Sequence, residues 1–159
     1  MTNLKLTGRQ VERIALPHLE VSVLRAGLQL ATPTIDSGID AIVFSTDGGF
    51  HARPIQLKAF SGRGWSLYPR YEKFDQLLMT YVWCATTAEA AVLVMTYAEA
   101  FRVAEAMGFT KTASWITGLK SGKPGYAVTN MRVDGKLHRL VRPYLATPKR
   151  WRQLLGCPE

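Results

Sequence analysis

The sequence predicts an α/β protein in which a mixed β-sheet is flanked by helices. Two segments, residues 7–25 and 97–107, place apolar residues at helical spacing and are closely followed by a glycine. Between them lie short segments rich in β-branched and aromatic residues, separated by turn residues. With 159 residues, 47% of them hydrophobic and 20% charged, the chain is long enough for one soluble domain with a sizeable core.

The first predicted helix covers residues 7–25. Thr7 can cap its start, and Gly27 can end it. Pro17 lies inside the segment and removes one backbone N–H donor. The segment is therefore either one kinked helix or two helices, the second with Pro17 in its first turn.

A short strand, residues 28–32, is expected next, followed by a β-hairpin. The arms of the hairpin are residues 39–45 and 54–60, and the Thr-Asp-Gly-Gly sequence of residues 46–49 forms the turn because glycine tolerates positive φ. If the hairpin is centred on Gly48, residues whose numbers sum to 96 lie opposite one another. A bulge would shift this register by one residue and turn side chains to the other face.

The rest of the chain predicts further strands and one more helix. Strands are expected at residues 65–68, 77–85 and 90–96, with residues 71–76 as a link. A second hairpin is expected around Asp134-Gly135, with residues 126–133 and 136–145 as its arms. A last helix begins at Thr147-Pro148 and ends at Gly156. We expect residues 1–108 to form the core and residues 109–159 to form a basic extension packed on it, within one domain.

The net charge of +8 lies entirely in the C-terminal part of the chain. Residues 1–101 carry nine Lys or Arg and nine Asp or Glu, whereas residues 102–159 carry eleven against three. Such a surplus indicates either a face for polyanions such as nucleic acid, with binding that weakens steeply with salt, or simply a basic surface. The candidate nucleic-acid-binding residues are Lys120, Lys123, Arg139, Arg142, Lys149, Arg150 and Arg152.

Composition also bears on the compartment and on metal chemistry. The N-terminus lacks the pattern of a signal peptide, and no apolar run is long enough to span a membrane. Two cysteines, Cys84 and Cys157, are too few for a disulfide framework, so we expect a cytoplasmic protein with reduced thiols. The three histidines are scattered, so a zinc site is not expected.

One constellation in the first hairpin points to chemistry. In the register centred on Gly48, Asp40 faces Gln56, and Lys58 lies on the same face as Gln56. A carboxylate, an amide and an ammonium then converge. The carboxylate and amide oxygens suit a hard divalent cation such as Mg²⁺, and the ammonium adds a positive charge beside it. The alternative is an ordinary half-exposed strand in which Gln56 and Lys58 face water. For Asp36, in the preceding loop, we favour a turn-forming role.

These residues resemble the metal-binding hairpin of the PD-(D/E)xK nuclease superfamily. The resemblance lies in Pro33 to Asp40 followed by Ile55-Gln56-Leu57-Lys58. Upstream, Gly8-Arg9-Gln10-Val11-Glu12-Arg13 is similar to the G-x-x-x-E-R helix of Holliday-junction resolvases in that superfamily. Glu20, two helical turns beyond Glu12, is the less favoured candidate for the helix carboxylate.

The resemblance implies a role for each residue of the constellation. Asp40 would be the central ligand of Mg²⁺ or Mn²⁺, and Gln56 would take the second acidic position. The carbonyl of Leu57 would be a further ligand. Lys58 would be the motif lysine, and Glu12 would be the helix carboxylate that contacts the metal directly or through water.

The resemblance covers residues 7–100 and implies a restriction-endonuclease-like core. It implies a metal-dependent nuclease, in particular a DNA endonuclease that hydrolyses phosphodiester bonds, although the sequence does not distinguish DNA from RNA. Many enzymes of this superfamily act as dimers, so a homodimer is possible, but the sequence does not give the oligomeric state. Gln56 departs from the usual Glu or Asp, and an amide adds no charge to attract a cation. That departure leaves open a non-catalytic nucleic-acid-binding or regulatory protein on a degenerate nuclease fold.

Overall fold

The computed structural model describes residues 5–119 and 121–157. The helices are α1 (Gly8–Arg25), α2 (Tyr97–Ala106), α3 (Ala113–Thr117), α4 (Lys136–Val141) and α5 (Pro148–Leu155). The strands are β1 (Gln29–Ala31), β2 (Ala41–Ser45), β3 (His51–Ala59), β4 (Trp65–Leu67), β5 (Leu78–Trp83), β6 (Ala91–Thr96) and β7 (Tyr126–Val128). Three 3₁₀ turns complete the list: η1 (Pro69–Lys73), η2 (Phe109–Lys111) and η3 (Arg142–Tyr144).

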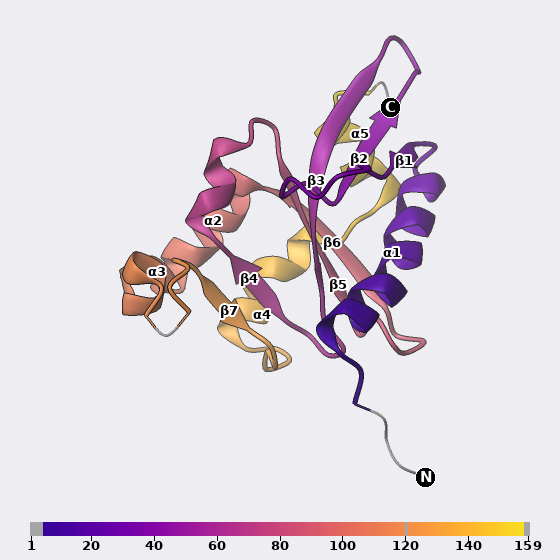
Figure 1. Cartoon of the computed structure of the whole chain (residues 1–159). Helices are drawn as coiled ribbons and strands as arrows, with labels where there is room; N and C mark the ends of the chain where they lie inside the picture. Colours follow the sequence, from indigo (N-terminus) through magenta and orange to yellow (C-terminus); the bar gives the residue numbers. More distant parts are fainter. Residues whose placement is uncertain (1–4, 120, 158–159) are drawn as a thin grey trace.

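The main sheet has five strands in the order β1-β2-β3-β5-β6 (Figure 1). Strands β3 and β5 run parallel, and the other neighbours run antiparallel. Strands β4 and β7 form a separate antiparallel pair. The prediction of an α/β protein with a mixed sheet and flanking helices is therefore confirmed.

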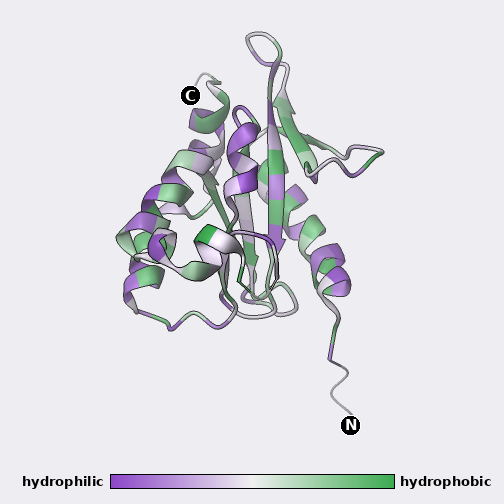
Figure 2. Ribbon diagram, turned by 60° about the vertical axis from the view of Figure 1, so that its left-hand side comes forward, coloured by the Kyte–Doolittle hydropathy of each residue, from purple (hydrophilic) through white to green (hydrophobic). Residues whose placement is uncertain are grey.

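Helices cover both faces of this sheet. One hydrophobic cluster joins α1 and α5 to strand residues such as Ile55 and Leu57. The other joins α2, α3, α4 and β4 to residues such as Met79 and Tyr81. Hydrophobic and hydrophilic stretches alternate along the helices and strands (Figure 2). Because side chains alternate along β3, Gln56 and Lys58 point to the side of the sheet opposite to Ile55 and Leu57.

Helix α1 is continuous through Pro17, which settles the alternative that the sequence left open. Its start is fixed by a capping box, in which Thr7 and Gln10 exchange side chain-to-backbone hydrogen bonds. The buried residues Val11, Ala15, Leu19 and Val23 recur every four positions on both sides of the proline. Both halves of the helix are therefore buried along the same side, and the proline itself lies on the exposed side.

The first hairpin has the predicted register. Ala41 pairs with Ile55, Val43 with Arg53 and Ser45 with His51, and each pair of numbers sums to 96. Strand β3 begins at His51, three residues earlier than expected, so the turn is shorter.

The second predicted hairpin is wrong. The segment expected as its second arm forms α4, because Leu137 and Val141 are four residues apart and bury on one side. Of the expected first arm, only Tyr126–Val128 is a strand, and it pairs with β4 instead. Asp134 and Gly135 lead into the helix rather than forming a two-residue hairpin turn.

The C-terminal segment contributes to both sides of the sheet. Phe109, Trp115 and Leu137 belong to the cluster with α2. Trp151 of α5 is fully buried against α1, where its indole N–H donates to the Ser22 hydroxyl at 2.9 Å.

Both cysteines are free and buried. Within residues 5–119 and 121–157, no helix combines the length and apolar character that a membrane crossing requires.

Candidate functional site

Asp40 lies at the point where β2 separates from β3. Its backbone N–H donates to the Ile55 carbonyl at 2.9 Å, and its Oδ2 accepts the Leu57 backbone N–H at 2.7 Å. The last β2–β3 pair is Ala41 with Ile55, although β3 continues to Ala59. The carboxylate therefore takes the place of a backbone acceptor at the open edge of β3, which fixes its position.

Gln56 is buried beside this carboxylate, with 6% of its surface exposed. Its side-chain Nε2 donates to Oδ2 of Asp40, and its Oε1 is buried without a hydrogen-bond partner. A buried unpaired carbonyl oxygen costs about 1–3 kcal/mol. A hard cation would satisfy this oxygen. If the amide rotated and turned Oε1 toward Asp40, two acceptor oxygens would face each other, and a cation between them would stabilise the pair.

Lys58 is held on the same side of β3 by aromatic residues. Its Nζ donates to the Tyr71 hydroxyl at 2.9 Å and lies 5.6 Å from the Tyr68 ring centroid and 5.1 Å from that of Tyr71. The Tyr71 hydroxyl also accepts a hydrogen bond from Arg70 at 3.2 Å. The lysine thus has a fixed position although it is only half-buried.

Glu12 approaches the same place from α1. Burial raises the pKa of the Glu12 carboxyl, the Asp40 charge raises it further, and Lys58 lowers it. The helix carboxylate therefore lies within electrostatic range of the hairpin residues, with which it lines one hollow. Glu20, the other candidate on α1, is exposed and lines neither hollow of the cleft described below.

The Asp40 carboxyl also has a raised pKa. Burial is the largest cause, and Asp36 adds to it, while the Leu57 N–H, Lys58 and Gln56 act in the opposite direction. Negative charge is therefore concentrated in a partly dehydrated place. A bound cation would relieve both the repulsion between carboxylates and the loss of hydration.

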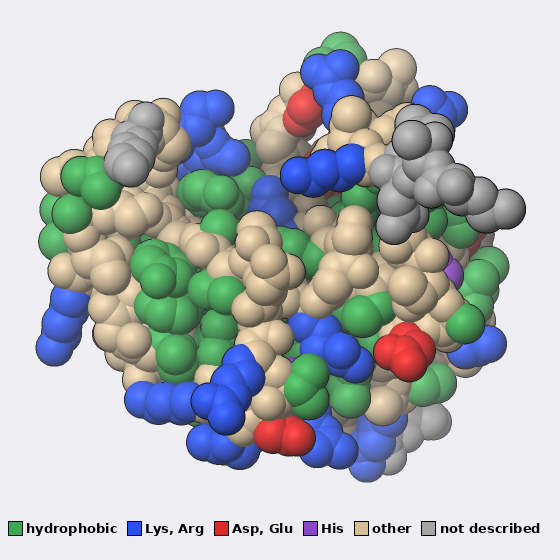
Figure 3. All heavy atoms as spheres, turned by 90° about the horizontal axis from the view of Figure 1, so that it is seen from below, with side chains coloured by type: hydrophobic (Ala, Val, Ile, Leu, Met, Phe, Trp, Pro, Cys, Tyr) green, Lys and Arg blue, Asp and Glu red, His purple; other side chains and the backbone are tan. Residues whose placement is uncertain are grey.

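These residues line a cleft with two adjoining hollows, of about 520 Å³ and 320 Å³. Both hollows are lined by Glu12, Asp36, Asp40 and Leu57. Asp36 also forms the expected turn, since its carboxylate accepts the Gly38 N–H at 3.0 Å. Seen from below, the molecule is hollowed between two lobes, with Lys and Arg side chains at the margins (Figure 3).

Besides Lys58 of β3, the cleft is lined by cations from two other elements. Arg9 and Arg13 of α1 line the larger hollow, and Arg70 and Lys73 of η1 line the smaller one. The structure thus places an acidic centre between two basic margins. A polyanion that crossed the cleft could contact both margins and present one of its phosphates to the centre.

A metal at this centre would need mixed oxygen ligands. Within the residues that the structure describes, no group of three or more His, Cys, Asp or Glu side chains could hold a metal ion by itself. The oxygens of Asp40 and Glu12, Oε1 of Gln56 and the Leu57 carbonyl remain as a donor set. Such a set suits Mg²⁺ or Mn²⁺ and keeps positions for water.

The predicted nucleic-acid-binding residues lie outside this cleft. Lys120 is outside the described residues. Lys123, Arg139, Arg142 and Lys149 are exposed, and Arg139 donates to the Asp134 carbonyl. None of the described members lines either of the two hollows.

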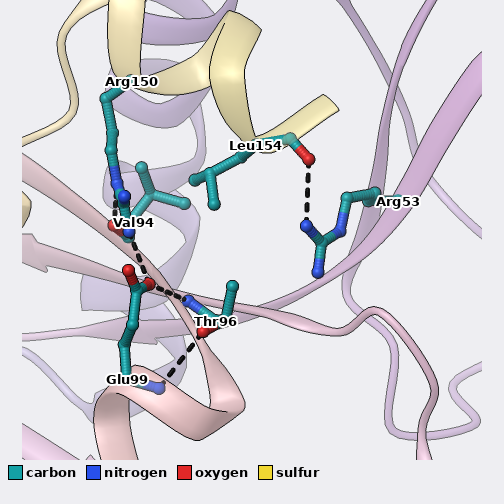
Figure 4. Close-up of polar contacts among 6 residues, drawn as sticks. All are labelled: Arg53, Val94, Thr96, Glu99, Arg150 and Leu154. Atoms are coloured by element: carbon teal, nitrogen blue, oxygen red, sulfur yellow. Dashed lines mark hydrogen bonds and ion pairs between the residues drawn. The ribbon is translucent and has the colours of Figure 1, made fainter. Parts of the chain in front are cut away.

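Two members of that group are engaged inside the fold. Arg150 forms an ion pair with Glu99, and the Nε of Arg150 donates to the Val94 carbonyl (Figure 4). The Glu99 carboxylate also accepts a hydrogen bond from the Thr96 N–H. Arg152 lies 3.8 Å from Asp47 and donates to the Ala26 carbonyl. A phosphate would have to compete with these partners for Arg150 and Arg152.

Sequence reasoning missed the basic and aromatic residues of the cleft. The sequence predicts only a link at residues 71–76. In the structure, residues 69–73 form η1, which places Arg70, Tyr71 and Lys73 beside Lys58. Arg9 and Arg13 lie four residues apart on the helix, a spacing that puts both on one side and could have placed them at one margin. No comparable pattern in the sequence connects Tyr71 to Lys58.

No protein-family model, curated protein or solved structure matches this chain. The candidate site therefore stands on its own geometry and chemistry.

Proposed function

We propose that this protein is a metal-dependent nuclease, and specifically a DNA endonuclease that hydrolyses phosphodiester bonds. The observation that carries the proposal is the convergence of Glu12, Asp40, Gln56 and Lys58 at one cleft. They come from α1, the residue before β2, and β3, so their meeting depends on the fold and not on sequence proximity. Two of the four, Gln56 and Lys58, are polar residues that alternate along β3 with the buried apolar residues Ile55 and Leu57.

The donor set fits Mg²⁺ or Mn²⁺. Asp40, Gln56 Oε1, the Leu57 carbonyl and Glu12 would hold the cation, which would polarise a phosphate and lower the pKa of a bound water. The unpaired, buried Oε1 of Gln56 supports this fit, because it is an oxygen donor with no protein partner. The restriction-endonuclease-like arrangement of the core is part of the same proposal.

The chain's own residues would supply position and charge. The Leu57 N–H holds the Asp40 carboxylate in place at the sheet edge. Tyr71 holds the Lys58 ammonium beside it, where the positive charge can orient water or stabilise charge developing on the phosphate. The basic margins of the cleft would bind the nucleic acid backbone on either side.

The proposal includes the setting of the activity. A cytoplasmic location is consistent with two free, buried cysteines. A homodimer would allow both strands of a duplex to be cut, and sedimentation at micromolar concentration tests it. DNA is favoured as the substrate, and RNA is the comparison to run beside it.

Cleavage of plasmid or branched DNA tests the function. Purified protein with Mg²⁺ or Mn²⁺ should nick the DNA, and EDTA should stop it. Lys58→Ala and Asp40→Ala should abolish nicking while leaving the circular dichroism spectrum unchanged. Variants as active as the parent would assign the activity to a contaminant, and a parent that never cuts with either metal would contradict the proposal.

A second candidate is a non-catalytic nucleic-acid-binding or regulatory protein on a degenerate nuclease fold. It is favoured by the hydrogen bond from Gln56 Nε2 to Asp40, which satisfies the carboxylate without a cation. A parent protein that binds DNA without cutting it, together with a Gln56→Glu variant that cuts, would identify this case.

A further inference from the structure

We propose that Arg70 and Lys58 together bind one phosphate of the nucleic acid backbone, and that Tyr71 is the positioning residue that holds the two cations side by side. The inference rests on the proposed function for the identity of the ligand. It assigns a subsite to η1, an element outside both the hairpin and α1.

The two cations share one hydrogen-bond acceptor. Lys58 Nζ donates to the Tyr71 hydroxyl at 2.9 Å, and an Arg70 Nη donates to the same oxygen at 3.2 Å. Both cations also lie over the same two rings, since Arg70 Cζ is 4.9 Å from the Tyr68 centroid and 5.1 Å from that of Tyr71. Tyr71 is only 3% exposed, so its hydroxyl is a fixed point.

Two like charges so close repel each other, and a neutral phenol does not cancel that repulsion. Among the described residues, neither Lys58 nor Arg70 has a salt bridge to a carboxylate. An anion between them would remove the repulsion. Arginine and lysine at adjacent positions offer the planar fork and the point charge that phosphate oxygens bind.

The surrounding space fits this ligand. Arg70 and Lys58 line the hollow of about 320 Å³ that also contains Asp40 and Gln56, and Lys73 lies at its margin. A phosphate held by the two cations would therefore lie beside the proposed metal ligands. Tyr68 and Tyr71, in an edge-to-face pair with centroids 5.9 Å apart, form an apolar wall beneath the cations.

Binding of labelled DNA in EDTA, followed by fluorescence anisotropy over a range of salt, tests the subsite without any cleavage. Arg70→Gln should weaken binding about tenfold and lower the salt slope by about one, as expected for one lost phosphate contact. Arg102→Gln is the matched control, because Arg102 is exposed on α2 and lines neither hollow. Equal affinities for the two variants would overturn the proposal.

Two further arms sharpen the result. If Tyr71 acts by holding Arg70, the effect of Arg70→Gln should be smaller in a Tyr71→Phe background, whereas additive effects would overturn the positioning role. The second arm adds inorganic phosphate, with chloride at the same ionic strength as the control. Phosphate that displaces the DNA where chloride does not would show a site for free phosphate and would overturn the assignment to a phosphate of the nucleic acid backbone.

The outcome is distinct from that of the cleavage test. A parent that cuts DNA, with an Arg70→Gln variant that binds and cuts like the parent, would reject the subsite and keep the nuclease. A parent that never cuts, with an Arg70→Gln variant that binds DNA weakly, would reject the nuclease and keep the subsite.

Discussion

The Asp40 carboxylate and the Leu57 backbone N–H form a 2.7 Å hydrogen bond at the edge where β2 leaves β3. A side chain thus replaces the strand that would otherwise satisfy this donor. The same oxygen accepts Nε2 of Gln56, so one carboxylate organises both the sheet edge and the candidate site.

Asp40→Asn should separate the structural role of Asp40 from its charge. The asparagine oxygen can still accept the Leu57 N–H, so the free energy of unfolding in EDTA should stay the same or rise as a buried charge is removed. Cleavage should fall at least about a hundredfold, because the central anionic ligand is lost. Asp75→Asn, on an exposed carboxylate outside the cleft, is the control and should cut normally.

Gln56→Glu should strengthen metal binding and weaken the metal-free protein. An added carboxylate should tighten Mn²⁺ binding about tenfold, measured by calorimetry. Without metal, the new charge lies beside Asp40 in a buried position, so the melting temperature in EDTA should fall. An unchanged Mn²⁺ affinity would mean that this side chain is not a ligand.

Acid should stop metal binding at a higher pH than ordinary carboxylates would predict. Burial raises the pKa of both Asp40 and Glu12, so protons compete with the cation sooner as pH falls. The effect of pH on folding has the opposite sign. Asp40 binds a proton more readily in the folded protein than in the unfolded chain. Its contribution to the free energy of unfolding therefore falls as the pH rises from the ordinary pKa of an aspartate through the raised pKa of Asp40. Urea unfolding in EDTA should show this pH dependence flattened in Asp40→Asn; an equal dependence in parent and variant would contradict it.

Glu99→Gln should destabilise the fold without affecting the site. Burial tends to raise the pKa of Glu99, but the Thr96 N–H and Arg150 together lower it (Figure 4). Ionised Glu99 therefore stabilises the fold at pH values above the ordinary pKa of a glutamate. This stabilisation is lost as the pH falls through the lowered pKa of Glu99. The variant should lose about 2 kcal/mol at neutral pH by leaving Arg150 without its counter-charge.

The matched control for that change is Glu105→Gln, on an exposed position of the same helix. It should change the free energy of unfolding by no more than about 0.5 kcal/mol. DNA affinity equal to that of the parent in both variants would agree with a purely structural role for the Arg150 pair. Tighter DNA binding by folded Glu99→Gln, through an Arg150 freed to contact phosphate, would contradict it.

The two basic regions can be ranked by DNA binding in EDTA. Arg9→Gln with Arg13→Gln removes two cations from the cleft, and Lys123→Gln with Arg142→Gln removes two exposed cations elsewhere. The cleft pair should weaken binding more, since its charges flank the site. A larger loss from the second pair would return the interface to the C-terminal surface.

The sequence predicted the parts of the molecule that depend on local rules. Turn chemistry around Gly48 and strand alternation gave the register that brings Asp40 to Gln56, and Thr7 capped the first helix as expected. The second hairpin failed because Leu137 and Val141 fit a helix, and burial on one side decided for it.

The parts that could not be predicted depend on contacts between distant segments. Tyr71 meets Lys58 only because the chain returns through η1, and no spacing rule encodes that contact. A positive charge in the sequence does not reveal its partner, so Arg150 was assigned to phosphate although Glu99 binds it inside the fold. Both the contact between Tyr71 and Lys58 and the pairing of Arg150 with Glu99 therefore depend on long-range folding that the sequence pattern does not show.

The most direct measurement is the structure of crystals soaked in Mn²⁺, with the metal located by its anomalous scattering. We expect one peak bound by Asp40, by Oε1 of Gln56 and by the Leu57 carbonyl, at about 2.0–2.3 Å from each oxygen, with Glu12 reaching it directly or through water. A crystal soaked in saturating Mn²⁺ that shows no anomalous peak at this site, with Nε2 of Gln56 still donating to Asp40, would contradict a metal-dependent nuclease.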